Sequence, residues 1–265
     1  MTNGDIVQQL RALKLPGIRE HLEARIMEAE SNNLSYAEFL SMLLTDELDQ
    51  RATRRIQRLL HRAQLGSDTT LETFDWEFNP NINAKLIRGL ASCRFVERGE
   101  GIFFIGPTGT GKTHLAKAIA HTACRMMFTV SYYTFSGLLT ALALADLQNK
   151  LPLAMKRLLA VDLLVIDDFG LKTIDQVSAE RLYAIVDGRF RAKSIILTSN
   201  RALTDWPGFF PDPIIANAIL DRIAHTSHQI ILKGPSYRKK LQVKTDEVEE
   251  TERDQTKRHR ASAKR

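Results

Sequence analysis

Apolar residues recur at helical spacing through most of residues 1–65, where glycine is almost absent. The pattern is interrupted at Pro16 and again just before Ser35, so three helical stretches are expected. Ser35 and Glu38 form a capping box at the start of the third stretch, and Asp5 is expected to cap the first. The pattern predicts a small all-α domain.

Short, continuous apolar runs replace this pattern over residues 84–236. Five such runs alternate with helical segments: IFFI (102–105), TVSYY (129–133), LLVIDDF (163–169), SIILTSN (194–200) and QIILK (229–233). Runs that are apolar throughout are typical of parallel strands covered by helices on both faces. This region is therefore predicted to be an α/β domain built on a five-stranded parallel sheet.

Two segments fit neither pattern. Residues 66–83 contain turn residues without a helical period, which predicts a linker between the two domains. Residues 237–265 form an acidic block followed by a basic end, with few apolar side chains. Such a composition buries too little surface to offset the entropy of ordering, so a disordered tail is expected.

The composition narrows the choice of partners. The chain has 37 Lys and Arg against 31 Asp and Glu, a net charge of +6, which favours nucleic acid although a ribosome or a membrane surface fits equally. Cys93 and Cys124 stand alone in unrelated segments, which favours a reducing compartment. Because no secretory signal pattern or long apolar run occurs, a cytoplasmic protein without a membrane partner is expected.

The segment GPTGTGKT fits the G-x-x-x-x-G-K-[ST] pattern and lies between a predicted strand and a predicted helix. Its glycines let several backbone N–H groups converge on one phosphate, Lys112 reaches the β- and γ-phosphates, and the Thr113 hydroxyl is a Mg²⁺ ligand. A chance glycine turn would not explain the flanking strand and helix. ATP and Mg²⁺ are therefore the predicted cofactors. The predicted nucleotide-binding residues are Gly106, Pro107, Thr108, Gly109, Thr110, Gly111, Lys112, Thr113 and His114.

Two carboxylates end the third apolar run. Asp167 is predicted to complete the Mg²⁺ site, as the acid of a Walker B segment does. Asp168 is predicted to orient and polarise the attacking water. Its side chain is short for that role, and a residue that caps a turn is the alternative.

Two further polar residues are candidates for catalysis. Asn200 ends the fourth run, where it could hydrogen-bond the γ-phosphate or the attacking water, or merely cap the following turn. Arg222 lies near the end of an apolar helical face in residues 212–225. It could act as an arginine finger on the nucleotide of a neighbouring subunit, or form a surface ion pair with Asp221.

A row of arginines is the main candidate for DNA contact. The row falls within an arc of roughly 100° on the third helix, and no acid interrupts it. Its members are Arg51, Arg54, Arg55, Arg58 and Arg62. Contact with phosphates is predicted, and a solvated helix face is the alternative. If all five contact phosphates, the plot of log K against log salt has a slope of about −4.5.

Several segments together resemble a known family. GPTGTGKTHLAKAIA, LLVIDDFG, LTSNR and ILDRIAH, in this order, resemble the DnaC-like branch of the AAA+ ATPases. LRALKLPGIREHL, ASCRFVERGE and KGPSYR are more specifically similar to the IstB family of ATP-binding helper proteins, which are encoded beside the transposase in one class of bacterial insertion sequences. The resemblance covers about residues 5–240 and depends on these flanking segments, since many families share the P-loop.

The resemblance implies an ATPase that assembles with copies of itself on duplex DNA and recruits or stimulates its partner transposase. It assigns Walker A roles to Lys112 and Thr113, Walker B roles to Asp167 and Asp168, a sensor role to Asn200, and the role of a trans-acting finger to Arg222. A finger in trans requires a homo-oligomer.

The chain departs from the broader AAA+ pattern after Arg222. About 15 residues separate it from Tyr237, too few for the usual helical lid. Arg238 is a candidate replacement for the missing second sensor.

Other functions remain open. A DnaC-type helicase loader would use the same nucleotide-binding residues, but its amino-terminal helices would grip a helicase and single-stranded DNA would be preferred. A small-molecule or nucleoside kinase would need a lid that binds the acceptor, and it has no evident use for Arg222 or for a basic helix. The transposase itself fits poorly, because the recognised elements serve ATP binding and oligomer formation.

Overall fold

The computed structural model describes residues 3–66 and 68–237. Two compact units divide the chain, Met1–His61 and Arg62–Arg265. Arg238 and the rest of the predicted tail beyond Tyr237 lie outside the described residues.

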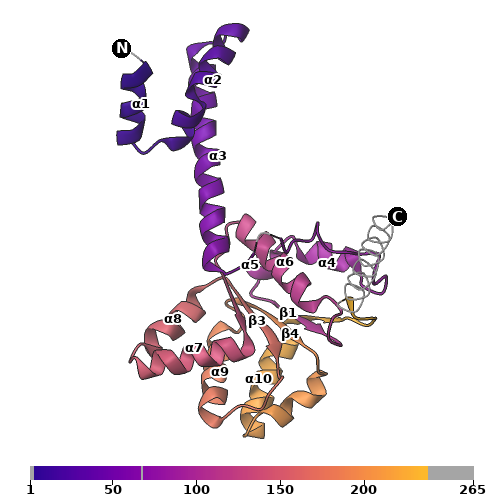
Figure 1. The fold of residues 1–265 in the computed structure, drawn as a ribbon. Helices are drawn as coiled ribbons and strands as arrows, with labels where there is room; N and C mark the ends of the chain where they lie inside the picture. Colours follow the sequence, from indigo (N-terminus) through magenta and orange to yellow (C-terminus); the bar gives the residue numbers. More distant parts are fainter. Residues whose placement is uncertain (1–2, 67, 238–265) are drawn as a thin grey trace, which may run out of the picture. The chain divides into compact units, whose positions relative to one another are not determined.

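The amino-terminal region is helical, as the spacing of its apolar residues predicts (Figure 1). Its helices are α1 (Asn3–Ala12), α2 (Pro16–Asn32) and α3 (Tyr36–Arg62). The predicted capping box is confirmed, because the Ser35 N–H donates to Glu38 Oε2 over 2.8 Å and the Glu38 N–H donates to Ser35 Oγ over 3.3 Å. The predicted cap at Asp5 is wrong, since α1 begins at Asn3 and Asp5 lies in its first turn. There its charge suits the positive end of the helix dipole.

A small apolar core holds these helices together. It consists of Leu10 from α1, Ile18 and Leu22 from α2, and Leu43 from α3. Full burial of one such side chain contributes about 1.5–3 kcal/mol. Four of them are too few to order a short unit alone, so other contacts must also stabilise it.

The second unit contains a five-stranded sheet in which every pair of neighbours is parallel. The strands are β1 (Gly101–Ile105), β2 (Val130–Thr134), β3 (Leu163–Phe169), β4 (Ser194–Ser199) and β5 (Ser227–Ile231). They are arranged in the order β2-β3-β4-β1-β5. The predicted five-stranded parallel sheet is confirmed, and β1 lies between two strands that follow it late in the sequence.

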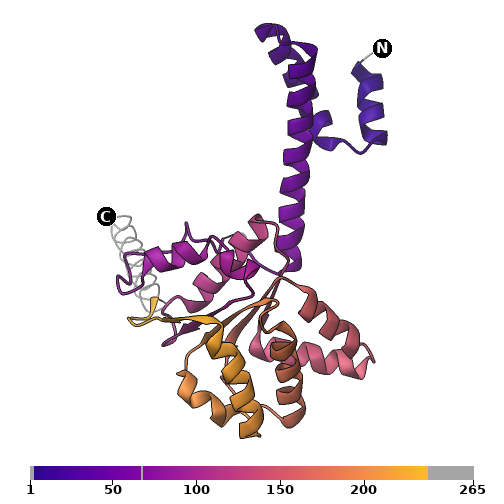
Figure 2. The same cartoon turned by 180° about the vertical axis from the view of Figure 1, so that it is seen from behind.

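Helices cover both faces of the sheet (Figures 1 and 2). On one side lie α4 (Ala84–Leu90), α5 (Arg94–Glu97) and α6 (Lys112–Arg125), and on the other lie α7 (Phe135–Leu147), α8 (Leu151–Ala160), α9 (Gln176–Arg189), the 3₁₀ helix η1 (Leu203–Phe209) and α10 (Pro213–His225). Along β1, Phe103 and Ile105 belong to the core shared with α7, α9 and α10. Because successive side chains of a strand point to opposite faces of the sheet, Ile102 and Phe104 lie on the face that α6 covers.

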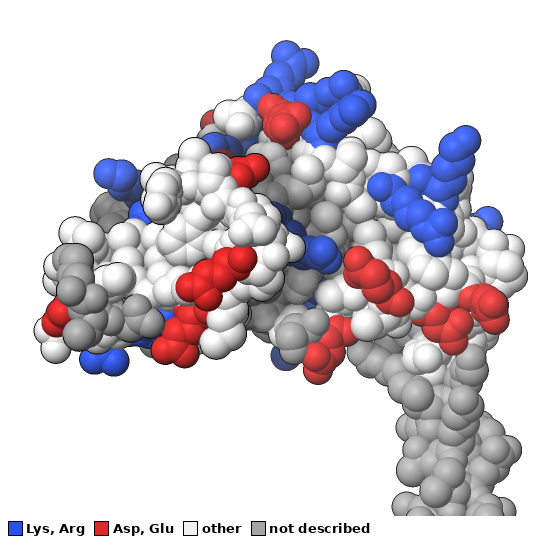
Figure 3. All heavy atoms as spheres, turned by 90° about the horizontal axis from the view of Figure 1, so that it is seen from above, with Lys and Arg blue, Asp and Glu red and all other residues white. Residues whose placement is uncertain are grey.

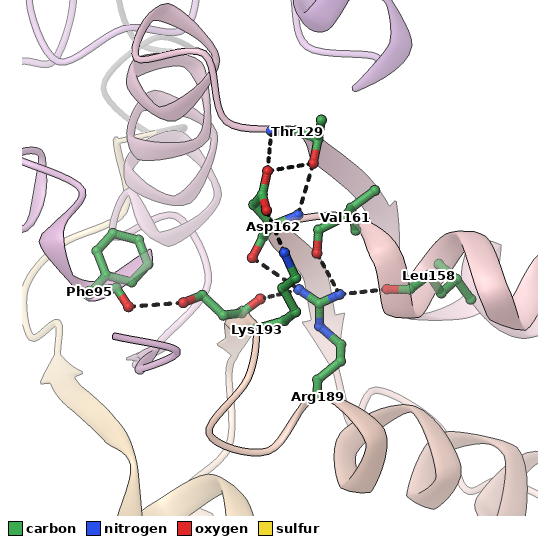
Figure 4. A network of polar contacts seen from close by, with 8 residues as sticks. Phe95, Thr129, Leu158, Val161, Asp162, Arg189 and Lys193 are labelled. Carbon is green, nitrogen blue, oxygen red and sulfur yellow. Dashed lines mark hydrogen bonds and ion pairs between the residues drawn. The ribbon is translucent and has the colours of Figure 1, made fainter. Parts of the chain in front are cut away.

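A buried arginine fastens the amino-terminal edge of the sheet (Figure 4). The guanidinium of Arg189, the last residue of α9, is fully buried and donates to four backbone carbonyls, those of Leu158, Val161, Asp162 and Ser194, over 2.5–3.2 Å. Burial lowers the pKa of Arg189 to about 10, so the side chain remains a cation at neutral pH. This cation joins α8 and α9 to the starts of β3 and β4.

The carboxylate of Asp162 extends this network. It accepts hydrogen bonds from Thr129 N–H over 2.9 Å and Thr129 Oγ1 over 2.7 Å, and it pairs with Lys193 Nζ at 2.6 Å. Thr129 precedes β2, so the network reaches the edge strand of the sheet as well.

Both cysteines are buried and unpaired. Burial raises the pKa of Cys93 to about 11 and that of Cys124 to about 12, so neither is a thiolate at neutral pH.

Among the described helices, none combines the length and apolar composition needed to span a bilayer. The charged side chains are unevenly distributed on the face drawn in Figure 3, where most Lys and Arg lie toward the upper edge of the view and most Asp and Glu toward the lower.

Replacement of Arg189 by methionine tests the role of the buried network. Arg189→Met leaves four carbonyls without their donor, and an unsatisfied buried acceptor costs about 1–3 kcal/mol. The free energy of unfolding of the second unit is expected to fall by at least about 3 kcal/mol in urea denaturation. Arg191→Met is the control, because Arg191 is exposed and two residues away. Equal losses in the two variants would mean that the carbonyls do not depend on this guanidinium.

Candidate nucleotide-binding site

The loop between β1 and α6 has the curled backbone that a phosphate-binding loop needs. Gly109 and Gly111 adopt φ angles of +85° and +97°, a region that other residues rarely adopt. A Cβ atom on Gly111 would also lie 2.9 Å from the ring of Phe74. Only glycine fits at this position, for both reasons.

Lys112 is held inside the curve of this loop. The side chain is buried, and Nζ donates to the carbonyls of Gly106 over 2.7 Å and Pro107 over 2.8 Å. The Thr110 hydroxyl donates to the same Pro107 carbonyl over 2.9 Å. The predicted loop residues therefore surround a fixed positive charge at the start of α6, where the helix dipole adds to it.

The carboxylate of Asp167 is buried at the end of β3 and accepts hydrogen bonds from three hydroxyl groups. Thr113 Oγ1 donates to Oδ1 over 3.0 Å, and Thr198 Oγ1 donates to the same oxygen. Tyr132 OH donates to Oδ2 over 2.7 Å. Burial and the neighbouring Asp167 raise the pKa of Tyr132, so its phenol stays protonated and keeps donating.

The oxygen atoms at this point fit a Mg²⁺ ion. Adjacent ligands of an octahedral Mg²⁺, each at about 2.0–2.1 Å, lie about 2.9 Å apart. Thr113 Oγ1 and Asp167 Oδ1 are separated by 3.0 Å. A hydroxyl and a carboxylate are also the hard oxygen donors that Mg²⁺ prefers, so these two residues would hold the ion beside the phosphates.

Asp168 occupies an irregular point of β3. Its φ angle is +58°, and the pairing of β3 with β4 shifts register between Ile166 and Phe169. The Asp168 N–H donates to Thr198 Oγ1 over 2.9 Å, while its side chain is exposed. A bulge of this kind redirects a side chain. Asp168 therefore lies within the strand, not in a turn, and borders the hollow described next.

A hollow of about 1110 Å³ brings together eight of the predicted catalytic and binding residues. It is lined by Lys112, Thr113, Asp168 and Asn200, and by Thr108, Gly109, Gly111 and His114 of the loop and its flank. The turn after β4 is capped by Ser199, whose Oγ accepts the Arg201 N–H over 3.2 Å. The exposed Asn200 side chain makes no hydrogen bond to another described residue, so it is available to a ligand in the hollow.

Arg222 lies away from this hollow. It occupies the last turn of α10, just before β5, and the first residue of β5 pairs with Gly101 at the start of β1. The P-loop follows the other end of β1, about 13 Å along the strand. The predicted alternative partner, Asp221, pairs instead with His225 at 3.0 Å.

The side chains that contact Arg222 come from α9, and its Nη1 also donates to the Ala218 carbonyl of α10 over 3.1 Å. Its Nε donates to Asp187 Oδ1 over 2.7 Å and its Nη2 to Tyr183 OH over 3.0 Å. The guanidinium carbon lies 5.0 Å from the centre of the Tyr183 ring. Arg222 is therefore not positioned to act on the nucleotide of its own subunit.

The segment predicted as a linker packs on the P-loop. His114 Nε2 lies 2.9 Å from the Thr70 carbonyl oxygen, and the rings of Phe74 and His114 meet edge to face at 5.2 Å. From the other end of the domain, Tyr237 N–H donates to the Gly109 carbonyl over 2.9 Å. Phe74, His114 and Tyr237 border a partly aromatic pocket of about 470 Å³, within the usual size range of small-molecule sites.

Comparison with known proteins identifies the family. The sequence matches the model described as IstB-like ATP binding protein over residues 8–245. The chain belongs to this family. The predicted resemblance is therefore confirmed, and so is the prediction of an ATP-binding protein.

Two relatives of this IstB-like chain are named as ATP-binding proteins of insertion sequences. The one from Mycobacterium tuberculosis is 36% identical over 230 residues, which cover 86% of this chain and 92% of the relative. The one from insertion sequence IS21 of Pseudomonas aeruginosa is 36% identical over 231 residues, 87% of each chain. The similarity thus extends over both units.

The crystal structure of the DnaC helicase loader has the same fold as the second unit. It superposes with a TM-score of 0.55 and 22% sequence identity, covering 63% of this chain and 98% of that chain. At this identity the likeness shows the fold alone. The predicted fold of the second unit, that of a P-loop AAA+ core, is confirmed.

Tyr132 was not predicted as a site residue, and its contact with Asp167 can be tested. Tyr132→Phe removes the donor to Oδ2 but keeps the ring, over which Lys117 Nζ lies at 4.6 Å. A hydrogen bond to a charged group contributes about 1.5–3 kcal/mol, so affinity for a fluorescent ATP analogue in Mg²⁺ is expected to fall at least about ten-fold.

Without Mg²⁺ the affinity of this variant for the ATP analogue is expected to match that of the unmodified chain. The reason is that the phenol donates to Asp167, the predicted Mg²⁺ ligand, and not to the P-loop. Tyr133→Phe is the control, since no described residue accepts a hydrogen bond from that hydroxyl. If Tyr132→Phe left Mg²⁺-dependent binding unchanged, the contact would have no role in holding Asp167.

Proposed function

We propose that this chain is an ATP-dependent transposition helper. ATP and Mg²⁺ bind at the P-loop, copies of the chain assemble on duplex DNA with nucleotide between subunits, and the assembly recruits or stimulates the transposase of the same insertion sequence. Membership of the IstB-like family and the names of the insertion-sequence relatives support this proposal. Hydrolysis of ATP resets the assembly.

In this proposal each side chain of the hollow has one task. The loop N–H groups and Lys112 bind the phosphates, while Thr113 and Asp167 hold Mg²⁺, which neutralises charge on the β- and γ-phosphates. Asp168 orients and polarises the attacking water and Asn200 contacts the γ-phosphate or that water. The partly aromatic pocket beside His114 receives the base, because it shares lining residues with the phosphate hollow.

The position of Arg222 is the observation that carries the proposal of a homo-oligomer. The arginine lies at the amino-terminal edge of the sheet and the P-loop at the carboxyl edge. An arginine finger must touch the γ-phosphate. Arg222 can therefore serve only the nucleotide of a second subunit, whose carboxyl edge meets this one's amino-terminal edge.

Mass photometry with duplex DNA, and separately with the matching single strand, tests the role of ATP. Large complexes are expected only when duplex, ATP and Mg²⁺ are all present, and Lys112→Ala is expected to abolish them because the loop loses its phosphate-binding charge. Lys85→Ala, an exposed lysine on α4, is the control and should assemble normally. Assembly on the single strand alone would replace the proposal with a DnaC-type helicase loader.

Asp168→Asn separates ATP binding from hydrolysis. The amide keeps the size of the side chain but cannot polarise water as a carboxylate does. The variant is expected to bind ATP normally, to release phosphate at least about 100-fold more slowly, and to accumulate assembled complexes on DNA. Phosphate release at the normal rate would remove Asp168 from the mechanism.

A mixing experiment tests whether Arg222 acts in trans. Asp168→Asn and Arg222→Ala proteins are each expected to lose most ATPase activity, by about 10³-fold or more for the finger. When they are mixed, some interfaces combine an intact Asp168 from one subunit with an intact Arg222 from the next. The rate of phosphate release by the mixture is therefore expected to exceed the sum of the rates of the two variants measured separately.

The control mixture pairs Asp168→Asn with Asn200→Ala, because both residues line the same hollow. These two lesions fall in the same nucleotide site, so every site in the mixed assembly lacks one group and no gain is expected. If the Arg222→Ala mixture also gained nothing, Arg222 would not be a trans-acting finger.

A further inference from the structure

A basic groove lies in the amino-terminal unit, where the turn between α1 and α2 meets α3. Its empty volume is about 820 Å³. The charged residues that line it are Arg11, Lys14, Arg19, Glu47, Arg51 and Arg54. Three of the five cations come from α1, α2 and the turn between them, more than 30 residues before those of α3. Of the helical row seen in the sequence, Arg51 and Arg54 line this groove and form one wall of it.

Glu47 fixes the two walls to each other. Its buried carboxylate accepts the Gly17 N–H over 2.7 Å and the Ile18 N–H over 3.4 Å, and it pairs with Arg51 Nε at 2.7 Å. A Cβ atom on Gly17 would lie 2.6 Å from the Asp46 carbonyl oxygen, so the first turn of α2 touches the α3 backbone directly. The cations are thus held in place by a packed and hydrogen-bonded joint.

The negative charge of Glu47 is used within this joint. Burial alone would raise its pKa, but hydrogen bonds from Arg51, Gly17 and Ile18 hold the pKa below its usual range, so the carboxylate is ionised. Arg51 is correspondingly committed to Glu47. Because Arg51 has an internal partner, it is not counted among the phosphate contacts proposed below.

The other four cations of the groove have no such partner. The side chains of Arg11, Lys14, Arg19 and Arg54 are exposed, and none forms a hydrogen bond or ion pair with another residue in the described part of the chain. Acids are present in the same unit, since Arg25 pairs with both Glu28 and Asp46. Four unpaired cations around one groove require counter-ions from outside.

We propose that this groove binds the sugar-phosphate backbone of duplex DNA through Arg11, Lys14, Arg19 and Arg54. The inference rests on the proposed assembly on duplex DNA and adds three cations, Arg11, Lys14 and Arg19, that the helical row does not include. A single small anion would not need cations that continue along α3 through Arg58. Duplex DNA presents one charge per about 1.7 Å of its axis, so a row of this length meets many phosphates. Contacts to phosphates read no bases, and binding is independent of sequence.

Removal of the three cations contributed by α1, α2 and their turn tests the groove. The variant R11Q/K14Q/R19Q of the full chain is titrated against a fluorescein-labelled duplex by anisotropy, with and without ATP and Mg²⁺, at salt between about 50 and 200 mM. The slope of log K against log salt is expected to become less negative by about 2.7, and Kd at the higher salt is expected to rise at least about ten-fold. The slope and Kd are expected to change equally for two duplexes of unrelated sequence.

Two further variants make the test specific. K85Q/K156Q/R157Q removes the same net charge from exposed sites of the second unit and is expected to keep the original slope and Kd. R11K/R19K keeps the charges and is expected to bind like the unmodified chain. Binding of a fluorescent ATP analogue and the thermal melting curve confirm that the nucleotide site and the fold of each variant are intact.

The outcomes separate this inference from the proposed function. If the unmodified chain and R11Q/K14Q/R19Q bind duplex with the same slope of log K against log salt, the proposed role of the groove is overturned. The transposition-helper proposal then stands. Equal weakening of both triple-glutamine variants would also overturn the groove, since only net charge would matter. If the unmodified chain fails to bind duplex in either condition, both proposals fail.

Discussion

The carboxylate of Asp167 is the contact on which the nucleotide-binding site depends. One of its oxygens accepts hydrogen bonds from Thr113 on α6 and Thr198 on β4, and the other accepts from Tyr132 on β2. Four elements that are distant in sequence are thus fixed around one buried charge. A buried charge without donors would be costly, so these hydroxyl groups both stabilise the carboxylate and set the direction in which it faces a metal ion.

The parallel sheet separates two kinds of site. All strands end at the same edge, so the P-loop, the acids of β3 and Asn200 gather there, whereas Arg189 and Arg222 lie at the opposite edge. Arg189 stabilises its edge with a packed network of carbonyls. Arg222 is only partly buried and contacts the side chains of Asp187 and Tyr183 on α9. This separation supports the proposal of an assembling ATPase whose nucleotide site is completed by a second subunit.

Residues 66–83, which the sequence predicts to be a linker, belong to the second unit and contribute contacts to the site. Phe74 packs on both Gly111 and His114, and the Thr70 carbonyl lies against the same histidine. Irregular segments carry no period of 2 or 3.6, so turn residues alone predict a connection without indicating what it touches. The aromatic contacts that border the smaller pocket become visible only when the two ends of the AAA+ domain, near Phe78 and Tyr237, are brought together.

The parallel sheet, the helical amino-terminal region, the P-loop and the family could all be predicted from the chain's residues, because they depend on local periodicity, short-range spacing and strings of neighbouring residues. Three contacts could be found only in the folded chain: Tyr132 donates to Asp167, Arg222 pairs with Asp187 and not Asp221, and Glu47 of α3 accepts the Gly17 N–H of α2. Such contacts join residues through strand register and helix packing. Neither is encoded in the spacing of any single segment, since each requires the positions of two elements at once.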